Sequence, residues 1–264
     1  MPYRHAESLK IYQFNTFHGT GLIHGVFTRH GGISPAPWDS LNVGSTVGDE
    51  ASRVKANKRL ALAAFQRSEA SLYEVWQTHS AAIVEVTSPR GGRDLVQADG
   101  IITDRPAVTL MMRFADCVPL VLYDARRHAA GLVHAGWLGT VRKTAAAAVQ
   151  AMMRAYGSRP ADLQAGIGPS IGPDHYEVGE DVQARVRDAF GEAAESFLPV
   201  VDGKVHFDLW SANRWLLERE GLGDVEVAGV CTACEPADWY SHRGERGRTG
   251  RFGAVVALQE ESGA

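Results

Sequence analysis

Short apolar runs between turn-forming residues dominate the first half of the chain. β-branched and aromatic residues from Leu22 to Arg29, followed by Gly31-Gly32, predict a strand that ends in a tight turn. The same pattern recurs from Leu72 to His134 and predicts a series of short strands. These lie at residues 72–76, 83–86, 100–103, 107–114, 118–123 and 129–134. We therefore expect a sheet core here.

Apolar residues at helical spacing lie before and after this strand-rich part. Asp49 is a candidate N-cap for a helix that runs to about Phe65. A second helix is predicted over residues 141–156, where Met152 and Met153 are expected to pack in the core. The remaining pattern predicts helices at 180–190 and 209–220 and strands at 163–167, 225–231 and 254–258.

Strands and helices mix without a strict β-α alternation, and no internal repeat, low-complexity tract or linker interrupts them. This order predicts a single α+β domain over residues 1–264. A chain of 264 residues is long enough to bury most of its apolar surface. Hydrophobic residues make up 45% and charged residues 22%, which is typical of soluble globular proteins and argues against a fibrous or disordered chain.

The charge pattern favours a small-molecule substrate over nucleic acid. The 31 acidic and 27 basic residues give a net charge of -4, and the basic residues are scattered except between Arg243 and Arg251. Apolar stretches fall well short of the roughly 20 residues that a membrane span needs. The first 17 residues lack the unbroken apolar core of a signal peptide. We expect a cytoplasmic protein with no nucleic-acid or membrane partner.

Three residues beside predicted strand ends, His79, Cys117 and His134, are the strongest candidates for chemistry. Each one alone has an ordinary explanation as a packed or hydrogen-bonded side chain. Together they provide the thiolate and imidazole ligands that zinc prefers, and three protein ligands leave a fourth position for water or substrate. Rigid strand ends are also where sites are commonly built. The pattern predicts a catalytic zinc centre with these three residues as ligands.

The other two cysteines form the pair Cys231-x-x-Cys234. An odd number of cysteines without an export signal indicates reduced thiols. The pair could be a redox motif or half of a zinc site, but no second such pair exists in the chain. Because free cysteine is most often simply packed, we expect a buried structural pair.

Ordered matches extend over nearly the whole chain and identify a family. Besides the segments around His79, Cys117 and His134, they comprise residues 27–34, 40–42, 166–171, 176–178, 207–209, 231–232 and 249–251. The chain resembles the bacterial multicopper polyphenol oxidoreductase (laccase-domain) family, also described as the purine nucleoside phosphorylase or peptidoglycan editing factor family. The resemblance implies a layered α/β/β/α sandwich with mixed sheets. It also implies one zinc ion bound by His79, Cys117 and His134.

The resemblance further implies an activity. Members of the family are reported to phosphorolyse adenosine, inosine, guanosine and methylthioadenosine, and to deaminate adenosine. The chain would then be a transferase and a hydrolase that uses purine nucleosides, phosphate and one zinc ion. Zinc lowers the pKa of bound water to about 7, which suits deamination. Phosphorolysis instead needs an anion site and an acid for the departing base.

Candidate substrate contacts lie in two polar loops. Arg29 and the backbone amides of Gly31-Gly32 are candidates for phosphate, and Asn42 and Gln77 for the nucleoside. Alternatively, these loops are held by their own hydrogen bonds. Leu138 stands where the resemblance leads us to expect arginine. Since leucine cannot bind an anion, this departure weakens the case for phosphorolysis but not for zinc binding.

Other functions remain open. Cys117, activated by His134 or His79, could be the nucleophile of a thiol hydrolase or amidase. Editing of a peptidoglycan precursor would be compatible with either a thiol or a zinc mechanism. Copper-dependent phenol oxidation is disfavoured because the ten histidines include no His-x-His pair. A binding module with a purely structural zinc ion is a further alternative, and no sequence feature indicates an oligomeric state.

Overall fold

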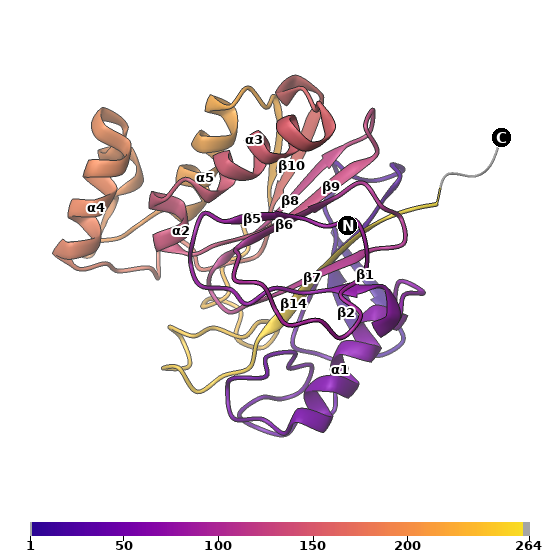
Figure 1. The fold of residues 1–264 in the computed structure, drawn as a ribbon. Coiled ribbons are helices and arrows are strands. Elements are labelled where there is room, and N and C mark those ends of the chain that lie inside the picture. Colours follow the sequence, from indigo (N-terminus) through magenta and orange to yellow (C-terminus); the bar gives the residue numbers. More distant parts are fainter. Residues whose placement is uncertain (1, 261–264) are drawn as a thin grey trace.

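Two six-stranded sheets stack face to face in the computed structural model, which describes residues 2–260 (Figure 1). The first sheet has the order β1 (Tyr3–Ala6), β2 (Leu9–Tyr12), β3 (Leu22–Phe27), β14 (Phe252–Leu258), β7 (Thr109–Phe114) and β4 (Leu72–Tyr73). The second has the order β13 (Asp224–Val227), β10 (Leu163–Ile167), β8 (Val118–Asp124), β9 (Ala129–Ala135), β6 (Gly100–Thr103) and β5 (Ile83–Glu85).

Both sheets are mixed. Most neighbouring strands are antiparallel, whereas β4 with β7, β5 with β6, and β10 with β13 are parallel. The pairing of β8 with β9 runs from Val118 opposite Ala135 to Asp124 opposite Ala129, and it places Pro119 opposite His134. The start of β8 therefore lies beside the end of β9, which determines where Cys117 meets His134.

Helices cover the outer faces of both sheets (Figure 1). Helix α1 (Ala51–Ala63) packs on the first sheet, whereas α3 (Thr144–Tyr156) and α5 (Leu209–Arg219) pack on the second. The short helix α2 (Trp137–Val141) follows β9, and α4 (Glu180–Phe190) precedes the small hairpin of β11 (Val200–Val201) and β12 (Lys204–Val205). No helix in residues 2–260 has the length and apolar character needed to cross a membrane.

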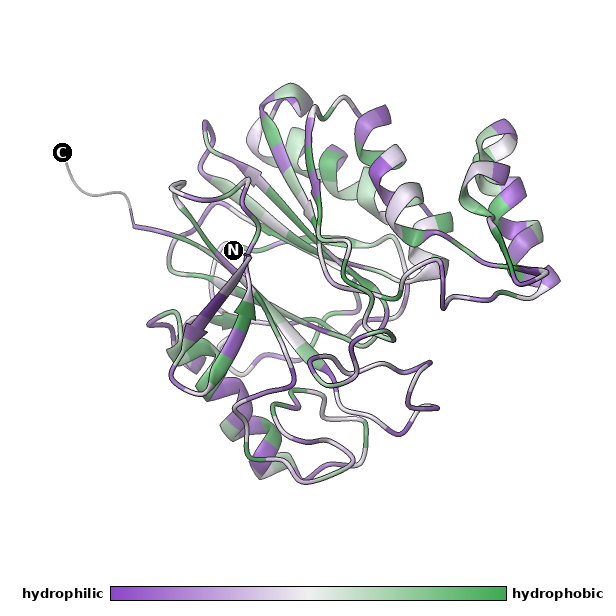
Figure 2. Cartoon of the chain, turned by 180° about the vertical axis from the view of Figure 1, so that it is seen from behind, coloured by the Kyte–Doolittle hydropathy of each residue, from purple (hydrophilic) through white to green (hydrophobic). Residues whose placement is uncertain are grey.

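Three apolar clusters hold the layers together. One lies between the sheets and includes Phe14, Phe114 and Phe252, and the other two lie between each sheet and its helices. Figure 2 shows this segregation: green, apolar positions concentrate on the strands, and purple positions concentrate on loops and outer helix faces. Buried apolar area is the dominant favourable contribution to folding.

The predicted α+β class and the layered sandwich are confirmed, and the predicted bounds of β6, β10 and α4 match the structure. The helix predicted over residues 141–156 is in fact interrupted. Lys143 adopts a left-handed conformation with φ 61°, which separates α2 from α3. Sequence periodicity does not detect such a break, because apolar residues continue at helical spacing on both sides of it.

Several local predictions were wrong. Met152 is buried as expected, but Met153 is 41% exposed. Glu50, not Asp49, is the N-cap of α1. The Asp49 carboxylate instead accepts hydrogen bonds from Ser34 Oγ at 2.6 Å and from Asn42 Nδ2 at 2.9 Å. These long-range partners outcompete the local capping bond. The strands β1 and β2 were not predicted at all, because charged residues interrupt their apolar pattern.

Candidate functional site

His79, Cys117 and His134 come together where the two sheets are joined. Cys117 lies in the short connection from β7 of the first sheet to β8 of the second, His134 lies in β9, and His79 lies in the loop between β4 and β5. One ligand atom from each residue lies within 4.8 Å of the others. The distance from Cys117 Sγ to His79 Nε2 is 3.9 Å. His134 is buried, Cys117 half-buried and His79 exposed, so the cluster is accessible from one side.

A single buried carboxylate, that of Asp99, orients both histidines. His134 Nδ1 donates to Asp99 Oδ1 at 2.9 Å, which leaves Nε2 of the ring free for a ligand. Asp99 Oδ2 accepts from the backbone N–H groups of Thr78 at 3.1 Å and Ser80 at 2.6 Å. These two residues flank His79, which adopts the left-handed conformation with φ 57°. Asp99 thus stabilises a backbone conformation that an L-residue rarely adopts.

Asp99 was not among the predicted site residues. Its only sequence signal is an acidic residue directly before the apolar strand β6. A carboxylate that is fully buried needs hydrogen-bond donors, and only the structure shows that these donors belong to the site.

The charges of the cluster favour a thiolate. Burial opposes ionisation of Cys117, but the imidazoles of His134 and His79 outweigh it and lower the pKa of the thiol to about 6. Burial likewise opposes protonation of His134, but Cys117 and Asp99 raise its pKa to about 9. Hydrogen bonds from His134 and Ser80 outweigh burial at Asp99 and hold the pKa of that carboxyl well below its usual range. Without a metal, these interactions favour a thiolate at Cys117 and an imidazolium at His134.

The donor set and its spacing fit a zinc ion. In a tetrahedral site, ligand bonds of about 2.3 Å to sulfur and 2.0 Å to nitrogen separate these atoms by roughly 3.6 Å. The observed 3.9 Å is close to this value. Gly136 leaves the necessary room, because a Cβ atom there would lie 2.8 Å from Cys117 Sγ and 3.0 Å from His79 Cδ2. Two imidazoles and one thiolate leave one tetrahedral position unfilled by protein.

A cavity of about 440 Å³ adjoins the cluster, within the size range of small-molecule sites. Its walls contain three arginines, Arg113, Arg243 and Arg251. Within residues 2–260, no carboxylate forms an ion pair with any of them. Guanidinium groups without a directly paired carboxylate make this wall suitable for an anionic ligand.

Carbonyl oxygens hold these arginines in place. Arg113 donates to Val75 O at 2.9 Å, Arg243 to Glu177 O at 2.9 Å, and Arg251 to Gly250 O at 2.8 Å. These bonds fix the guanidinium groups without neutralising them, and they leave further N–H groups for a ligand. Neither Arg113 nor Arg251 was among the predicted substrate-binding residues.

Of the candidate substrate residues, only Gln77 lines the cavity. Its amide accepts from Arg113 N at 3.0 Å and donates to Arg113 O at 2.8 Å, so it positions an arginine of the wall. Arg29 does not line the cavity. It forms ion pairs with Asp39 and Glu245 and stacks on Tyr240 at 4.6 Å. Its hydrogen-bonding capacity is used within the protein.

Asn42 is fully buried and also lies outside the cavity wall. Its Oδ1 accepts from the backbone N–H of Gly44 at 2.9 Å and of Arg251 at 2.8 Å. Asn42 therefore contributes indirectly, because it holds the backbone from which Arg251 reaches into the cavity.

Asp116 connects the cluster to the C-terminal part of the chain. It precedes Cys117 and has a positive φ of 79°. One of its carboxylate oxygens accepts from Thr232 Oγ1 at 2.7 Å and the other from Arg243 N at 2.6 Å. The loop that carries Arg243 is thereby held against the residues beside Cys117.

Comparison with known proteins identifies the family of this chain. The family model described as multi-copper polyphenol oxidoreductase laccase matches residues 23–259. The chain belongs to this family. Among its relatives, the purine nucleoside phosphorylase of Deinococcus radiodurans is 36% identical over 91% of this chain and 90% of that protein. The purine nucleoside phosphorylase YlmD of Bacillus subtilis is 35% identical over 90% of this chain and 89% of that protein.

Solved structures of family members have the same fold. The hypothetical protein YfiH of Bacillus licheniformis superposes with a TM-score of 0.89 at 34% identity, covering 98% of this chain and 99% of that one. YlmD of Geobacillus stearothermophilus superposes with a TM-score of 0.89 at 33% identity, covering 97% and 98%. The stacked sheets are thus a property of the family.

The name of the family refers to several copper ions. Residues 2–260 contain two clusters of side chains that could hold a metal ion. The first is His79, Cys117 and His134, and the second is Asp174, His175, Cys231 and Cys234. Cys231 is buried as expected, but Cys234 is exposed, so the prediction of a buried cysteine pair was half wrong.

Replacing Asp99 with asparagine is expected to weaken metal binding at the first cluster by about 10- to 100-fold. The neutral amide cannot match the carboxylate as an acceptor for both His134 and the loop of His79. A competition titration against a chromophoric chelator would measure the affinity. Asp124→Asn is the matched control, because Asp124 is equally buried but bonds only to backbone N–H groups of its own turn. Equal affinities of the Asp99→Asn and wild-type proteins would contradict the positioning role of Asp99.

Proposed function

We propose that this protein is a zinc-dependent purine nucleoside phosphorylase that also deaminates adenosine. One observation carries the proposal: a cluster suited to zinc adjoins a cavity whose wall has three arginines without carboxylate partners. The names of its relatives in Deinococcus radiodurans and Bacillus subtilis support the substrate class.

In this proposal, the three arginines of the cavity wall bind phosphate. During phosphorolysis, a phosphate oxygen forms a bond to the anomeric carbon while the bond from that carbon to the purine nitrogen breaks. The bonding electrons leave with the purine, which takes up a proton. Arg113, Arg243 and Arg251 would hold the phosphate by charge-assisted hydrogen bonds and orient it for this attack. They also supply the positive charge that Leu138 cannot.

Aromatic side chains in the cavity wall suit a purine. Trp76 is 44% exposed despite its size, and Trp137 and Tyr176 also line the cavity. Flat rings of this kind bind a heterocyclic base by stacking and exclude water from it. The wall therefore combines contacts for a base with contacts for an anion.

His79, Cys117 and His134 would hold the zinc ion. When bound there, zinc supplies Lewis-acid chemistry and lowers the pKa of coordinated water to about 7. Deamination of adenosine consumes one water and releases ammonia, with inosine as the product. The contribution of the chain is to fix the two histidine ligands through Asp99 and to leave the side toward the cavity open.

Product analysis tests this proposal. Purified protein incubated with adenosine and phosphate is expected to yield adenine, ribose 1-phosphate and inosine. Without phosphate, adenine formation should stop while inosine formation continues. If zinc is stoichiometric and no base is released in the presence of phosphate, the phosphorylase proposal is wrong.

A second candidate is a hydrolase or amidase in which Cys117 itself is the nucleophile, including one that edits a peptidoglycan precursor. The observation that favours it is the lowered pKa of the thiol, about 6, beside two imidazoles. This mechanism would require a metal-free cluster.

Alkylation at different pH values separates the two candidates. Because the thiolate is the reactive form, iodoacetamide labelling of Cys117 in metal-free protein should reach half its maximal rate near pH 6, well below the usual cysteine range. Peptide mapping by mass spectrometry would follow this residue. Protection by zinc would support the metal centre, whereas metal-free activity that labelling abolishes would support the thiol.

A further inference from the structure

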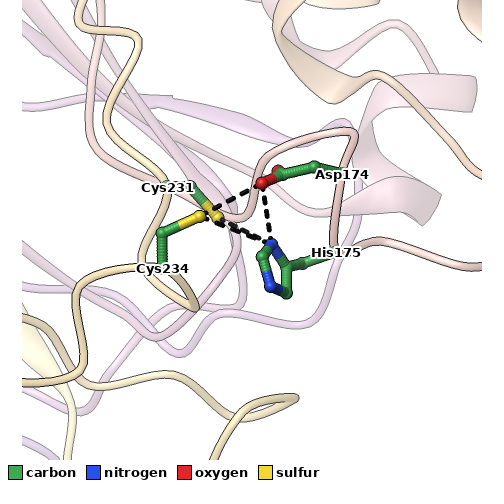
Figure 3. Close-up of side chains that lie close together, drawn as sticks. All are labelled: Asp174, His175, Cys231 and Cys234. Carbon is green, nitrogen blue, oxygen red and sulfur yellow. Dashed lines mark hydrogen bonds and ion pairs between the residues drawn. The ribbon is translucent and has the colours of Figure 1, made fainter. Parts of the chain in front are cut away.

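A second group of side chains of the types that bind metals lies outside the cavity wall. Asp174 and His175 come from the loop after β10, and Cys231 and Cys234 come from the turn after β13. Figure 3 shows the four side chains converging from these two segments. One donor atom from each lies within 4.8 Å of all the others. Neither the proposed activity nor the names of the relatives account for this cluster.

The distances within this group approach those of a tetrahedral site. His175 Nδ1 lies 3.7 Å from Cys231 Sγ and 3.4 Å from Cys234 Sγ. Asp174 Oδ2 is somewhat closer to its neighbours, at 3.1 Å from Cys234 Sγ and 2.9 Å from His175 Nδ1. Four ligands around one zinc ion are separated by roughly 3.3 to 3.8 Å. Small side-chain rotations would open the two shorter distances to this range.

A backbone group also positions Cys231. The N–H of Gly172 donates to Cys231 Sγ at 3.2 Å. The segments are closely packed here, because a Cβ atom on Gly172 would lie 2.5 Å from Asp174 Oδ1 and 3.1 Å from Cys231 Cβ. This packing holds the loop that carries Asp174 against the turn that carries Cys231.

We propose that Asp174, His175, Cys231 and Cys234 bind a second zinc ion. The two-residue spacing between the cysteines is the usual spacing of zinc ligands in structural sites. Two thiolates select zinc over magnesium or calcium, which prefer oxygen ligands. Four protein ligands leave no position for substrate, so the role of this ion is structural. The proposal is independent of the proposed nucleoside chemistry.

The second zinc ion would hold one side of the cavity in place. Tyr176, which lines the cavity, directly follows His175, and Arg243 lies over its ring at 5.1 Å. Thr232, between the two cysteines, donates to Asp116 beside Cys117. A metal bridge between the two segments would therefore restrict the movement of residues that contact both the cavity and the first cluster.

Metal analysis of matched variants tests the proposal. Wild-type protein is expected to contain about two zinc ions per chain, Cys117→Ala one, Cys234→Ser one, and the double variant none. Glu235→Gln is the control, because Glu235 is exposed, adjoins Cys234 and is not part of the cluster, so it should retain two. If the first cluster binds no zinc and the second one does, wild type and Cys117→Ala will each contain one zinc ion per chain. Cys234→Ser will then contain none.

Two outcomes would overturn the proposal. One is a Cys234→Ser protein that is folded by circular dichroism and contains as much zinc as wild type. The other is a disulfide between Cys231 and Cys234 in the isolated protein, which thiol counting after denaturation with a chelator would reveal as one free thiol instead of three. All three thiols are free in the structure.

If Cys234→Ser does not fold, the proposal can still be tested by cobalt absorption on a protein in which the second cluster is unchanged. The Cys117→Ala protein, loaded with cobalt, is expected to show thiolate-to-cobalt charge-transfer absorption, because Cys231 and Cys234 are the two cysteines that remain to bind the metal. Absence of this absorption, together with absence of zinc from the same protein, would overturn the proposal.

Discussion

Cys117→Ala is expected to remove the metal from the first cluster and to lower kcat/KM for adenosine by about 10³-fold or more, or about 4 kcal/mol. Cys117 is the only anionic ligand, and the imidazoles of His79 and His134 alone provide too few donors for a stable zinc site. Zinc content and steady-state kinetics, measured on the same preparation, would show whether the two losses coincide.

Cys117→His controls for the loss of the side chain itself. Histidine restores a third nitrogen ligand, so this variant should bind more zinc than Cys117→Ala and recover part of the turnover. Thermal unfolding would establish that both variants are folded. Full turnover by zinc-free Cys117→Ala protein would contradict the metal mechanism.

Arg243→Ala is expected to raise the KM for phosphate by roughly 10- to 100-fold, which corresponds to the loss of a charge-assisted hydrogen bond of about 1.5–3 kcal/mol. Deamination, which uses no phosphate, should change much less. Arg243 is suited to this test because it lines the cavity, is exposed and has no carboxylate partner among the described residues. Phosphorolysis and deamination assays with varied phosphate would separate the two effects.

Two further variants control for the charge and the loop. Arg243→Lys keeps the charge but loses the planar fork, so its KM for phosphate should lie between those of wild type and Arg243→Ala. Arg248→Ala removes an exposed charge from the same loop outside the cavity and should leave the KM unchanged. An equal loss of both activities in Arg243→Ala would contradict a specific role in phosphate binding.

The three candidate metal ligands could be identified from the sequence. His79, Cys117 and His134 each adjoin a predicted strand end, and the pairing of β8 with β9 places the second beside the third. The positions of the strands from β4 to β10 followed from apolar runs between turn residues, because such runs satisfy the burial pattern of stacked sheets. The layered order came from the family resemblance and agrees with the structure.

The anion-binding side of the cavity could not be predicted in the same way. Arg113 is a charged residue within an otherwise apolar strand, and Arg251 lies far along the chain, so only tertiary structure shows that they face the same cavity. Conversely, Arg29 lies in a sequence context typical of an anion-binding loop. Its guanidinium instead forms ion pairs with Asp39 and Glu245 and stacks on Tyr240. A pattern of residue types does not reveal which partners compete for a side chain.

The most direct test of the central claim, that His79, Cys117 and His134 share one zinc ion, is an anomalous difference map from crystals of the isolated protein at the zinc absorption edge. We expect a peak about 2.0 Å from one nitrogen of each imidazole and about 2.3 Å from Cys117 Sγ. Crystals of protein that converts adenosine, with no anomalous peak between these three side chains, would contradict the claim.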